Sequence, residues 1–280
     1  MNKIDTRPFE IATGKLEPRK LGPLPKLKWI AVDKLVIDPT YQRDILKTGL
    51  KNIVRIAHEF DWIKFATVIV APSGANKFAI VDGQHRTTAA ALRGVKEVPC
   101  QIIEAKAAQQ AAAFAAINAN ITAMSPMQLH AAKLAAGDTT ALRLKKCCAD
   151  AGVTILRYPV QTKNQKVGET MAVGMLYQML NKFGETVLVS ALNCITKTRN
   201  GNAGLIRGQL ITALCVNLEA EPPWQQSPKL LAVMGKLDMA DAIQRASREA
   251  TAGGGSNSQT AVLVEIIGAF LDQHLTVKVA

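Results

Sequence analysis

The clearest structural pattern in the chain lies in residues that read Lys77-Phe-Ala-Ile-Val-Asp-Gly-Gln-His-Arg-Thr-Thr-Ala-Ala-Ala-Leu-Arg-Gly-Val-Lys-Glu-Val-Pro-Cys-Gln-Ile-Ile103. The apolar run 78–81 predicts a strand, and Asp82-Gly83 is typical of a turn. The Ala-rich run 86–93 predicts a helix that stops at the next glycine. Residues 98–103 predict a second strand, and Pro99 should stand at its start or edge because proline has no N–H to donate.

This strand-turn-helix order predicts an anion site beyond the first strand. The first N–H groups of a helix lack intrahelical partners and lie at the positive end of the helix dipole, and Arg86 and His85 are adjacent to them. Gly83 permits a positive φ or a close approach of a ligand, and Thr87 and Thr88 add hydroxyls in the first turn. The ligand that best matches these groups is a phosphate. The alternative is an ordinary turn with Asp82 as the helix N-cap and Arg86 in solvent.

Three ordered segments resemble the motifs of the ParB/sulfiredoxin-like superfamily. Asp-Gly-Gln-His-Arg with its Ala-rich helix, and the Val-Pro pair that follows, resembles the phosphate-binding motif of that family. Leu35-Val-Ile-Asp-Pro-Thr-Tyr-Gln-Arg43 resembles the first ParB motif, and Phe114-Ala-Ala-Ile-Asn-Ala-Asn-Ile-Thr-Ala-Met-Ser-Pro126 resembles the third. The resemblance covers about residues 29–137, and three motifs in order are more specific than one.

The resemblance implies a nucleotide site. In the family the Gly-x-x-Arg turn holds nucleotide phosphates, those of CTP in ParB proteins. We therefore expect a nucleoside triphosphate, CTP or ATP, with Mg²⁺ held by Asn118, at the family's Asn position, and by Asp82, whose carboxylate lies beside the expected phosphate. The residues implied to bind the cofactor are Gln42, Arg43, Asp82, Gly83, Gln84, His85, Arg86, Thr87, Thr88 and Asn118.

The chain departs from the family at positions that matter for chemistry. Ile117 and Ile121 stand where the family has Glu and Arg, which removes a metal-binding and a phosphate-binding group. Gln84 occupies the position at which sulfiredoxin has its nucleophilic Cys. Glutamine cannot act as that nucleophile, so sulfiredoxin activity is not expected. No catalytic residue is assigned. The Asp-Gly-Gln-His-Arg string is also similar to that of DGQHR-domain proteins associated with DNA modification and mobile elements, which implies a phage- or plasmid-type protein.

Composition indicates a polyanionic partner. The chain has 34 Lys and Arg against 22 Asp and Glu, a net charge of +12, and only 5% aromatic residues. This balance favours DNA, contacted through phosphates rather than by stacking on bases. The five cysteines lack zinc-type spacing and suggest buried thiols in a reducing cytoplasm. No segment is apolar enough to predict a membrane span.

The expected organisation is a basic extended arm over 1–28, a ParB/sulfiredoxin-like nucleotide-binding domain over 29–124 and a helical domain over 125–280. The fold class is α+β, a small mixed sheet followed by mainly helical structure. Strands are expected over 29–37 and 66–71, and a helix over 45–60. Ser125-Pro126 is a strong helix start.

Two further features of the helical part have alternative interpretations. The helical patterns 169–182 and 185–197 are close enough for a helix-turn-helix that contacts DNA, but most such pairs only pack together. Arg143, Lys145 and Lys146 are either a nucleic-acid patch or a solvated helix face.

The function expected from these features is a ParB-like, DNA-associated protein that binds a nucleoside triphosphate. The alternatives are a phosphoryl-transfer enzyme or nuclease at the same turn, and an interaction protein with a vestigial anion site. The sequence leaves the oligomeric state open, with a homodimer as one option.

Overall fold

The computed structural model describes residues 20–40, 45, 47–119, 123–198, 203–252 and 258–275. The chain divides into two compact units, residues 1–122 and 123–280, and each is described by itself. Gln42, Arg43, Ile121 and most of the predicted basic arm lie outside the described residues.

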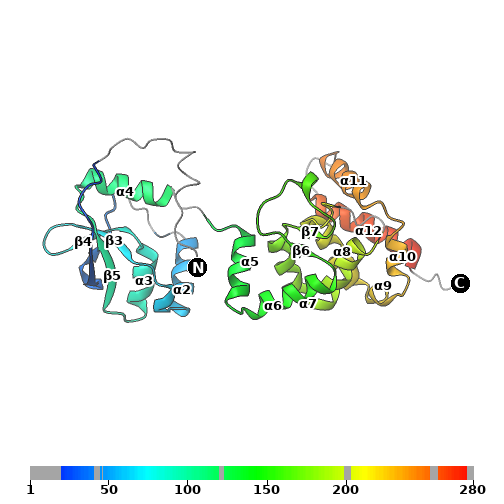
Figure 1. Ribbon diagram of the computed structural model, residues 1–280, viewed down its shortest axis with the longest axis horizontal. Helices are drawn as coiled ribbons and strands as arrows, with labels where there is room; N and C mark the ends of the chain where they lie inside the picture. Colours follow the sequence, from blue (N-terminus) through cyan, green and yellow to red (C-terminus); the bar gives the residue numbers. More distant parts are fainter. Residues whose placement is uncertain are drawn as a thin grey trace, which may run out of the picture. The chain divides into compact units, whose positions relative to one another are not determined.

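The first unit is a mixed five-stranded sheet with helices packed against it (Figure 1). Its strand order is β1-β5-β3-β4-β2, in which β1/β5 and β3/β4 are antiparallel and β5/β3 and β4/β2 are parallel. The elements are β1 (Lys26–Ala31), the 3₁₀ turn η1 (Val32–Lys34), β2 (Leu35–Val36), α2 (Lys47–His58), η2 (Trp62–Lys64), β3 (Val68–Pro72), β4 (Phe78–Asp82), α3 (Gln84–Leu92), β5 (Glu97–Ile102) and α4 (Ala107–Ala119).

Alternation along the strands sets the faces of this sheet. One face has a buried cluster of Ile30, Val68, Val70, Ile80, Val98 and Cys100, and Ala90 of α3 packs into it. Ala79 and Val81 alternate with Ile80 on β4, are also buried, and belong to the opposite face. Helix α2 packs beside α3, and α4 packs against β4. The end of β4 is therefore bordered by three helices.

The strand expected over 29–37 is two strands. β1 pairs with β5 and β2 pairs with β4, and β3 separates β5 from β4 in the sheet. One continuous strand cannot lie at both places, so η1 interrupts it. The first strand also begins at Lys26, inside the segment expected to be an extended arm.

Pro99 lies inside β5, a strand with neighbours on both sides, rather than at a strand start or a sheet edge. It faces Trp29 of β1, and the pairing of β5 with β3 begins only at the next residue, Cys100. The proline is tolerated because the ladder on the β3 side has not begun at its position.

The second unit is mainly helical, around one apolar core. Its elements are α5 (Pro126–Ala135), α6 (Thr139–Asp150), β6 (Thr154–Ile155), η3 (Thr162–Asn164), β7 (Glu169–Thr170), α7 (Val173–Thr196), α8 (Gly208–Ala220), α9 (Pro222–Gln226), α10 (Leu230–Met234), α11 (Met239–Ala252) and α12 (Gln259–Leu275). Ser125 caps α5 in a capping box with Gln128, as the sequence predicts. The α+β fold class, a mixed sheet followed by helices, is confirmed.

Helix α7 corrects the predicted helical pair. It begins at Val173, because Glu169–Thr170 form β7 with β6. Gly184 breaks the helix with φ 81° and ψ −180°, so the two halves are joined by a single residue. Leu188, Leu192 and Ile195 of the second half are fully buried in the core. Thr186 is the only exposed residue of this half, so the half has no free face that could enter a DNA groove, and the helix-turn-helix interpretation is not supported.

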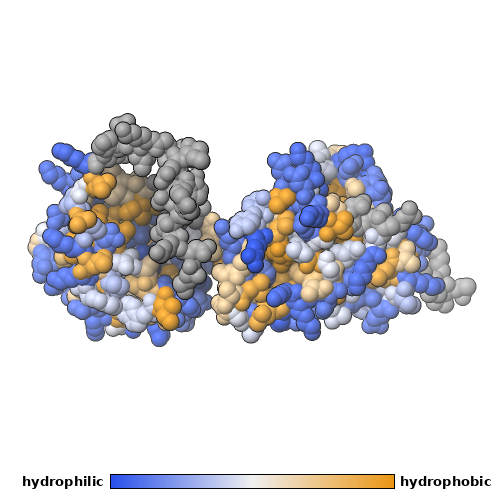
Figure 2. Space-filling view, viewed as in Figure 1, coloured by the Kyte–Doolittle hydropathy of each residue, from blue (hydrophilic) through white to orange (hydrophobic). Residues whose placement is uncertain are grey.

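On the face drawn in Figure 2, hydrophilic and hydrophobic side chains are interspersed over both units. No helix in the described part of the chain is long and apolar enough to cross a membrane.

Candidate functional site

The Asp82-Gly83 turn forms as predicted, but helix α3 begins earlier than expected. Gly83 is the N-cap residue, with φ 104° and ψ 17°, and the helix starts at Gln84 rather than at residue 86. Among the described residues no side chain caps it, and the Thr87 N–H donates to Gly83 O at 2.9 Å. The N–H groups without an intrahelical acceptor are therefore those of Gln84, His85 and Arg86.

The two threonines of the first turn do not face the site. Thr87 is 5% exposed, and its hydroxyl is buried without a hydrogen-bond partner in the part of the chain that the structure describes. Thr88 Oγ1 donates to Gln84 O at 2.9 Å, which is a bond within the helix. Neither residue lines the cavity described below, in contrast to the sequence-based expectation. Because the helix starts at Gln84, both threonines lie beyond its first three N–H groups.

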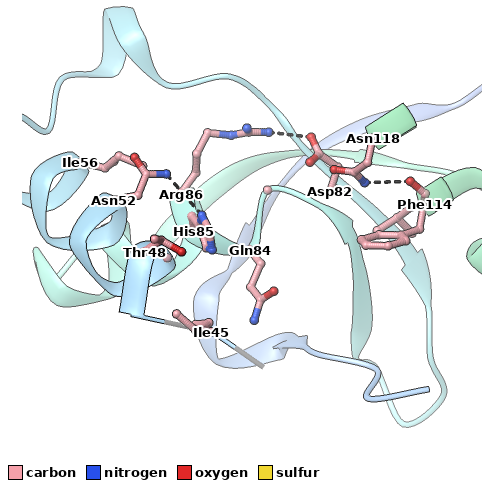
Figure 3. Close-up of a pocket in the computed structure, with 13 residues that line it drawn as sticks. Ile45, Thr48, Asn52, Ile56, Asp82, Gln84, His85, Arg86, Phe114 and Asn118 are labelled. Atoms are coloured by element: carbon pink, nitrogen blue, oxygen red, sulfur yellow. Dashed lines mark hydrogen bonds and ion pairs between the residues drawn. The ribbon is translucent and has the colours of Figure 1, made fainter. Parts of the chain in front are cut away.

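A cavity of about 330 Å³ opens at this turn. It is bordered by the end of β4, the start of α3, and side chains of α2 and α4, as Figure 3 shows. Its lining residues are Ile45, Thr48, Gly49, Asn52, Ile56, Val81, Asp82, Gly83, Gln84, His85, Arg86, Phe114 and Asn118. The structure thus brings together the turn and Asn118, which the sequence identified. It adds residues of α2 that the sequence analysis did not identify.

Arg86 folds back over the turn. Its Nη2 lies 3.0 Å from Asp82 Oδ2 and donates to Thr67 O at 3.3 Å. The side chain is 27% exposed, so the ordinary-turn interpretation with Arg86 in solvent is wrong. A Cβ at Gly83 would approach Arg86 Nη2 at 3.1 Å, so the glycine also makes room for this fold-back. Arg86 Nε is buried and has no hydrogen-bond partner among the described residues.

His85 is held by α2 and lies beside Asn52 (Figure 3). Arg55 Nη2 donates to Asn52 Oδ1 at 2.7 Å, which fixes the amide orientation. Asn52 Nδ2 therefore points to His85 Nδ1, 3.3 Å away. Since Nδ1 accepts, the neutral ring carries its proton on Nε2 and presents a donor there. Gly49 leaves space for the ring, because a Cβ there would lie 3.1 Å from Nε2.

The oxygen ligands expected to hold a metal line the same cavity. Asn118 Nδ2 donates to Phe114 O at 2.8 Å, which leaves its side-chain oxygen for a ligand. The carboxylate of Asp82 supplies the second oxygen that could bind a metal ion. The described residues contain no group of three or more His, Cys, Asp or Glu that could hold a metal ion by itself. Any cation here would need ligand atoms from a bound molecule or water.

None of the five cysteines takes part in this site. All five are free and buried, and burial raises the pKa of the Cys100 thiol to about 11. Gln84 occupies the turn where sulfiredoxin has its nucleophile, and it lines the cavity.

Comparisons with known proteins identify the family of the chain. Residues 38–250 match the family of unknown function DUF6551. The chain belongs to the DUF6551 family. The matched part of this DUF6551 protein includes the whole cavity and most of the helical unit. No curated protein matches the sequence.

A solved structure that resembles this DUF6551 protein is the C-terminally truncated chromosome-partitioning protein ParB from Caulobacter crescentus, complexed with CTP-gamma-S. The similarity covers 79% of this chain and 98% of that chain, with 13% sequence identity and a TM-score of 0.35. That TM-score is too low to assign function, so the properties of the DUF6551 site are inferred from its own residues.

Proposed function

We propose that this protein binds a nucleoside triphosphate at the Asp82–Arg86 turn and acts together with DNA. The observation that carries the proposal is the convergence of three uncapped N–H groups and the Arg86 guanidinium on one cavity. Several donors with a positive charge match a phosphate better than a carboxylate. The cavity volume, about 330 Å³, is at the lower end of the range for small-molecule sites.

Each side of the cavity has a separate role in this proposal. The N–H groups of Gln84, His85 and Arg86 bind phosphate oxygens, and the Nε2–H of His85 adds a side-chain donor. The apolar part of the lining, with Phe114, Ile45 and Ile56, accommodates the nucleoside. The resemblance to ParB motifs favours CTP or ATP as the nucleotide.

Magnesium fits the donor set. Asp82 and Asn118 supply one carboxylate and one amide oxygen, and Mg²⁺ is commonly held by one or two such groups with substrate phosphates and water. When bound, the ion would neutralise phosphate charge. Asp82 would then turn its charge to the cation, which leaves the Arg86 guanidinium available to the nucleotide.

Association with DNA is the second half of the proposal. It is supported by the net charge of +12 and by the resemblance of the Asp-Gly-Gln-His-Arg segment to proteins of mobile elements. A phage or plasmid origin is part of this proposal.

The nucleotide half is tested by calorimetry with CTP, ATP, GTP and UTP, each with and without Mg²⁺. We expect at least one nucleotide to bind in the presence of Mg²⁺ with a Kd below 1 mM. If no nucleotide binds at millimolar concentration, the proposed ligand is wrong.

A further inference from the structure

Two loops of the second unit pack against each other and form one surface. Thr170 Oγ1, at the end of β7, donates to Ile206 O at 2.7 Å. Gly204 lies against η3 so closely that a Cβ there would meet Thr162 Cγ2 at 2.6 Å. The loop 156–168 and the segment 203–207 are therefore held in fixed proximity.

The C-terminal end of α7 reaches the same region. Thr196 Oγ1 donates to Ala151 O at 2.7 Å, and a Cβ at Gly168 would meet Gly152 O at 2.6 Å. Through these contacts the end of α7, where Lys197 follows Thr196, packs against the turn at 151–152, and that turn packs against Gly168. The surface thus joins three segments that are separate in sequence.

This surface is strongly basic. We call it the basic loop surface and define it by its exposed cations Arg157, Lys163, Lys166, Lys197 and Arg207. The described segments 151–168, 196–198 and 203–207 contain no Asp or Glu; the carboxylate of the flanking Glu169 accepts a hydrogen bond from the backbone N–H of Lys166 at 2.8 Å. None of the five cations forms an ion pair with a carboxylate in the described part of the chain. Their charges are available to an external anion.

Other basic features of the unit are less suitable. Arg143, in the cluster predicted from sequence, is paired with Glu185 at 2.7 Å. That contact lowers the pKa of the Glu185 carboxyl, with the hydrogen bond from Arg143 as the main cause. Arg245 and Arg248 on α11 lie near Glu249 and Asp241.

We propose that the basic loop surface binds the phosphate backbone of duplex DNA. This inference rests on the DNA half of the proposed function and names the surface that carries it. Several unpaired cations on rigidly packed loops match the regularly spaced charges of a duplex. Tyr158, 69% exposed, is the only aromatic residue in the described part of these segments, so the surface lacks a series of rings on which unpaired bases could stack.

The test is fluorescence anisotropy of the full chain with a labelled 24-bp DNA duplex between 50 and 200 mM salt. The test variant is Lys163→Gln/Lys166→Gln/Lys197→Gln, which leaves Arg207 in place because its Nε donates to Gly204 O at 2.5 Å. The control variant, Lys229→Gln/Lys236→Gln/Arg245→Gln, removes the same charge from exposed positions elsewhere in the unit. Each lost phosphate contact should flatten the slope of log K against log salt by about 0.9, so we expect a total of about 2.7.

The result that supports the inference is this flattened slope, with an affinity loss of at least about tenfold at 50 mM salt, in the test variant only. Equal loss in both variants, or tighter binding of single-stranded DNA or duplex RNA, overturns it. If the wild type binds no DNA at 50 mM salt, the inference and the DNA half of the proposed function both fail. Calorimetry with nucleotides on the same variants then reports separately on the nucleotide half. Thermal unfolding checks that each variant is folded.

Discussion

Arg86 Nη2 lies 3.0 Å from Asp82 Oδ2, so the only guanidinium lining the described cavity is already paired with a carboxylate. The two residues are four positions apart across the turn, and both side chains are about a quarter exposed. A phosphate that enters the cavity therefore meets a neutral pair rather than a free cation. The phosphate must therefore displace Asp82 from the guanidinium, or a cation must neutralise the Asp82 carboxylate.

The first prediction follows from this competition. Asp82→Asn should bind the nucleotide more tightly than the wild type when Mg²⁺ is absent, because the repulsive charge is removed and Arg86 is released. The ratio of affinities with and without Mg²⁺ should shrink accordingly, as measured by calorimetry. Glu104→Gln is the control, since it removes an exposed carboxylate of the same unit that pairs with Lys26 outside the cavity. An unchanged Mg²⁺ dependence in Asp82→Asn would show that Asp82 does not hold the ion.

The second prediction concerns the space that Gly49 leaves for His85. In Gly49→Ala the new methyl would lie 3.1 Å from His85 Nε2 and 3.0 Å from Ile45 Cγ2, so the ring must shift. The helix itself should gain up to about 1 kcal/mol, because alanine has the higher helix propensity. We therefore expect weaker nucleotide binding without a matching loss of thermal stability.

Gly174→Ala is the matched control for that variant. Gly174 lies in α7, and a Cβ there meets nothing within 4 Å. Wild-type affinity in Gly49→Ala would contradict the role given to the His85 ring.

The third prediction is that no cysteine is reactive in the folded protein. Burial raises the pKa of Cys100 to about 11 and those of Cys148, Cys194 and Cys215 to about 12. Burial is also the main cause that raises the pKa of Cys147. The thiols should stay protonated at pH 8, and the thiolate is the reactive form. A chromogenic disulfide reagent should therefore titrate five thiols in denaturant and none within minutes in buffer. Fast reaction of one thiol in buffer would contradict this.

Sequence reasoning worked where the structure is governed by local chemistry. The strand before Asp82, the positive φ of Gly83 and the cap at Ser125 follow from residue type and spacing alone. The run 86–93 predicts the start of α3 two residues late, and the observed start places the N–H groups without an intrahelical acceptor at Gln84–Arg86. Helix ends are the least predictable part of a helix, because several start positions have similar local free energies.

The contribution of α2 to the site depends on tertiary packing and was not predicted. Asn52 and Thr48 lie more than 30 residues before His85, and no local pattern relates them. The sequence contains one indication of this contribution. Gly49 interrupts an otherwise good helical pattern, where glycine lowers helix stability by about 1 kcal/mol relative to alanine. Such a glycine often indicates a close approach, here that of the His85 ring.

The most direct test of the central claim is calorimetry of the best-bound nucleotide, with Mg²⁺, on the wild type, Arg86→Ala and Arg93→Ala. Arg93 is exposed at the other end of α3 and does not line the cavity, so it controls for the loss of an arginine. Loss of a charge-assisted hydrogen bond should weaken binding by about 1.5 to 3 kcal/mol in Arg86→Ala, or about 10- to 150-fold in Kd. Arg93→Ala should bind like the wild type. Wild-type affinity in Arg86→Ala, or an equal loss in Arg93→Ala, would contradict the assignment of the nucleotide to this turn.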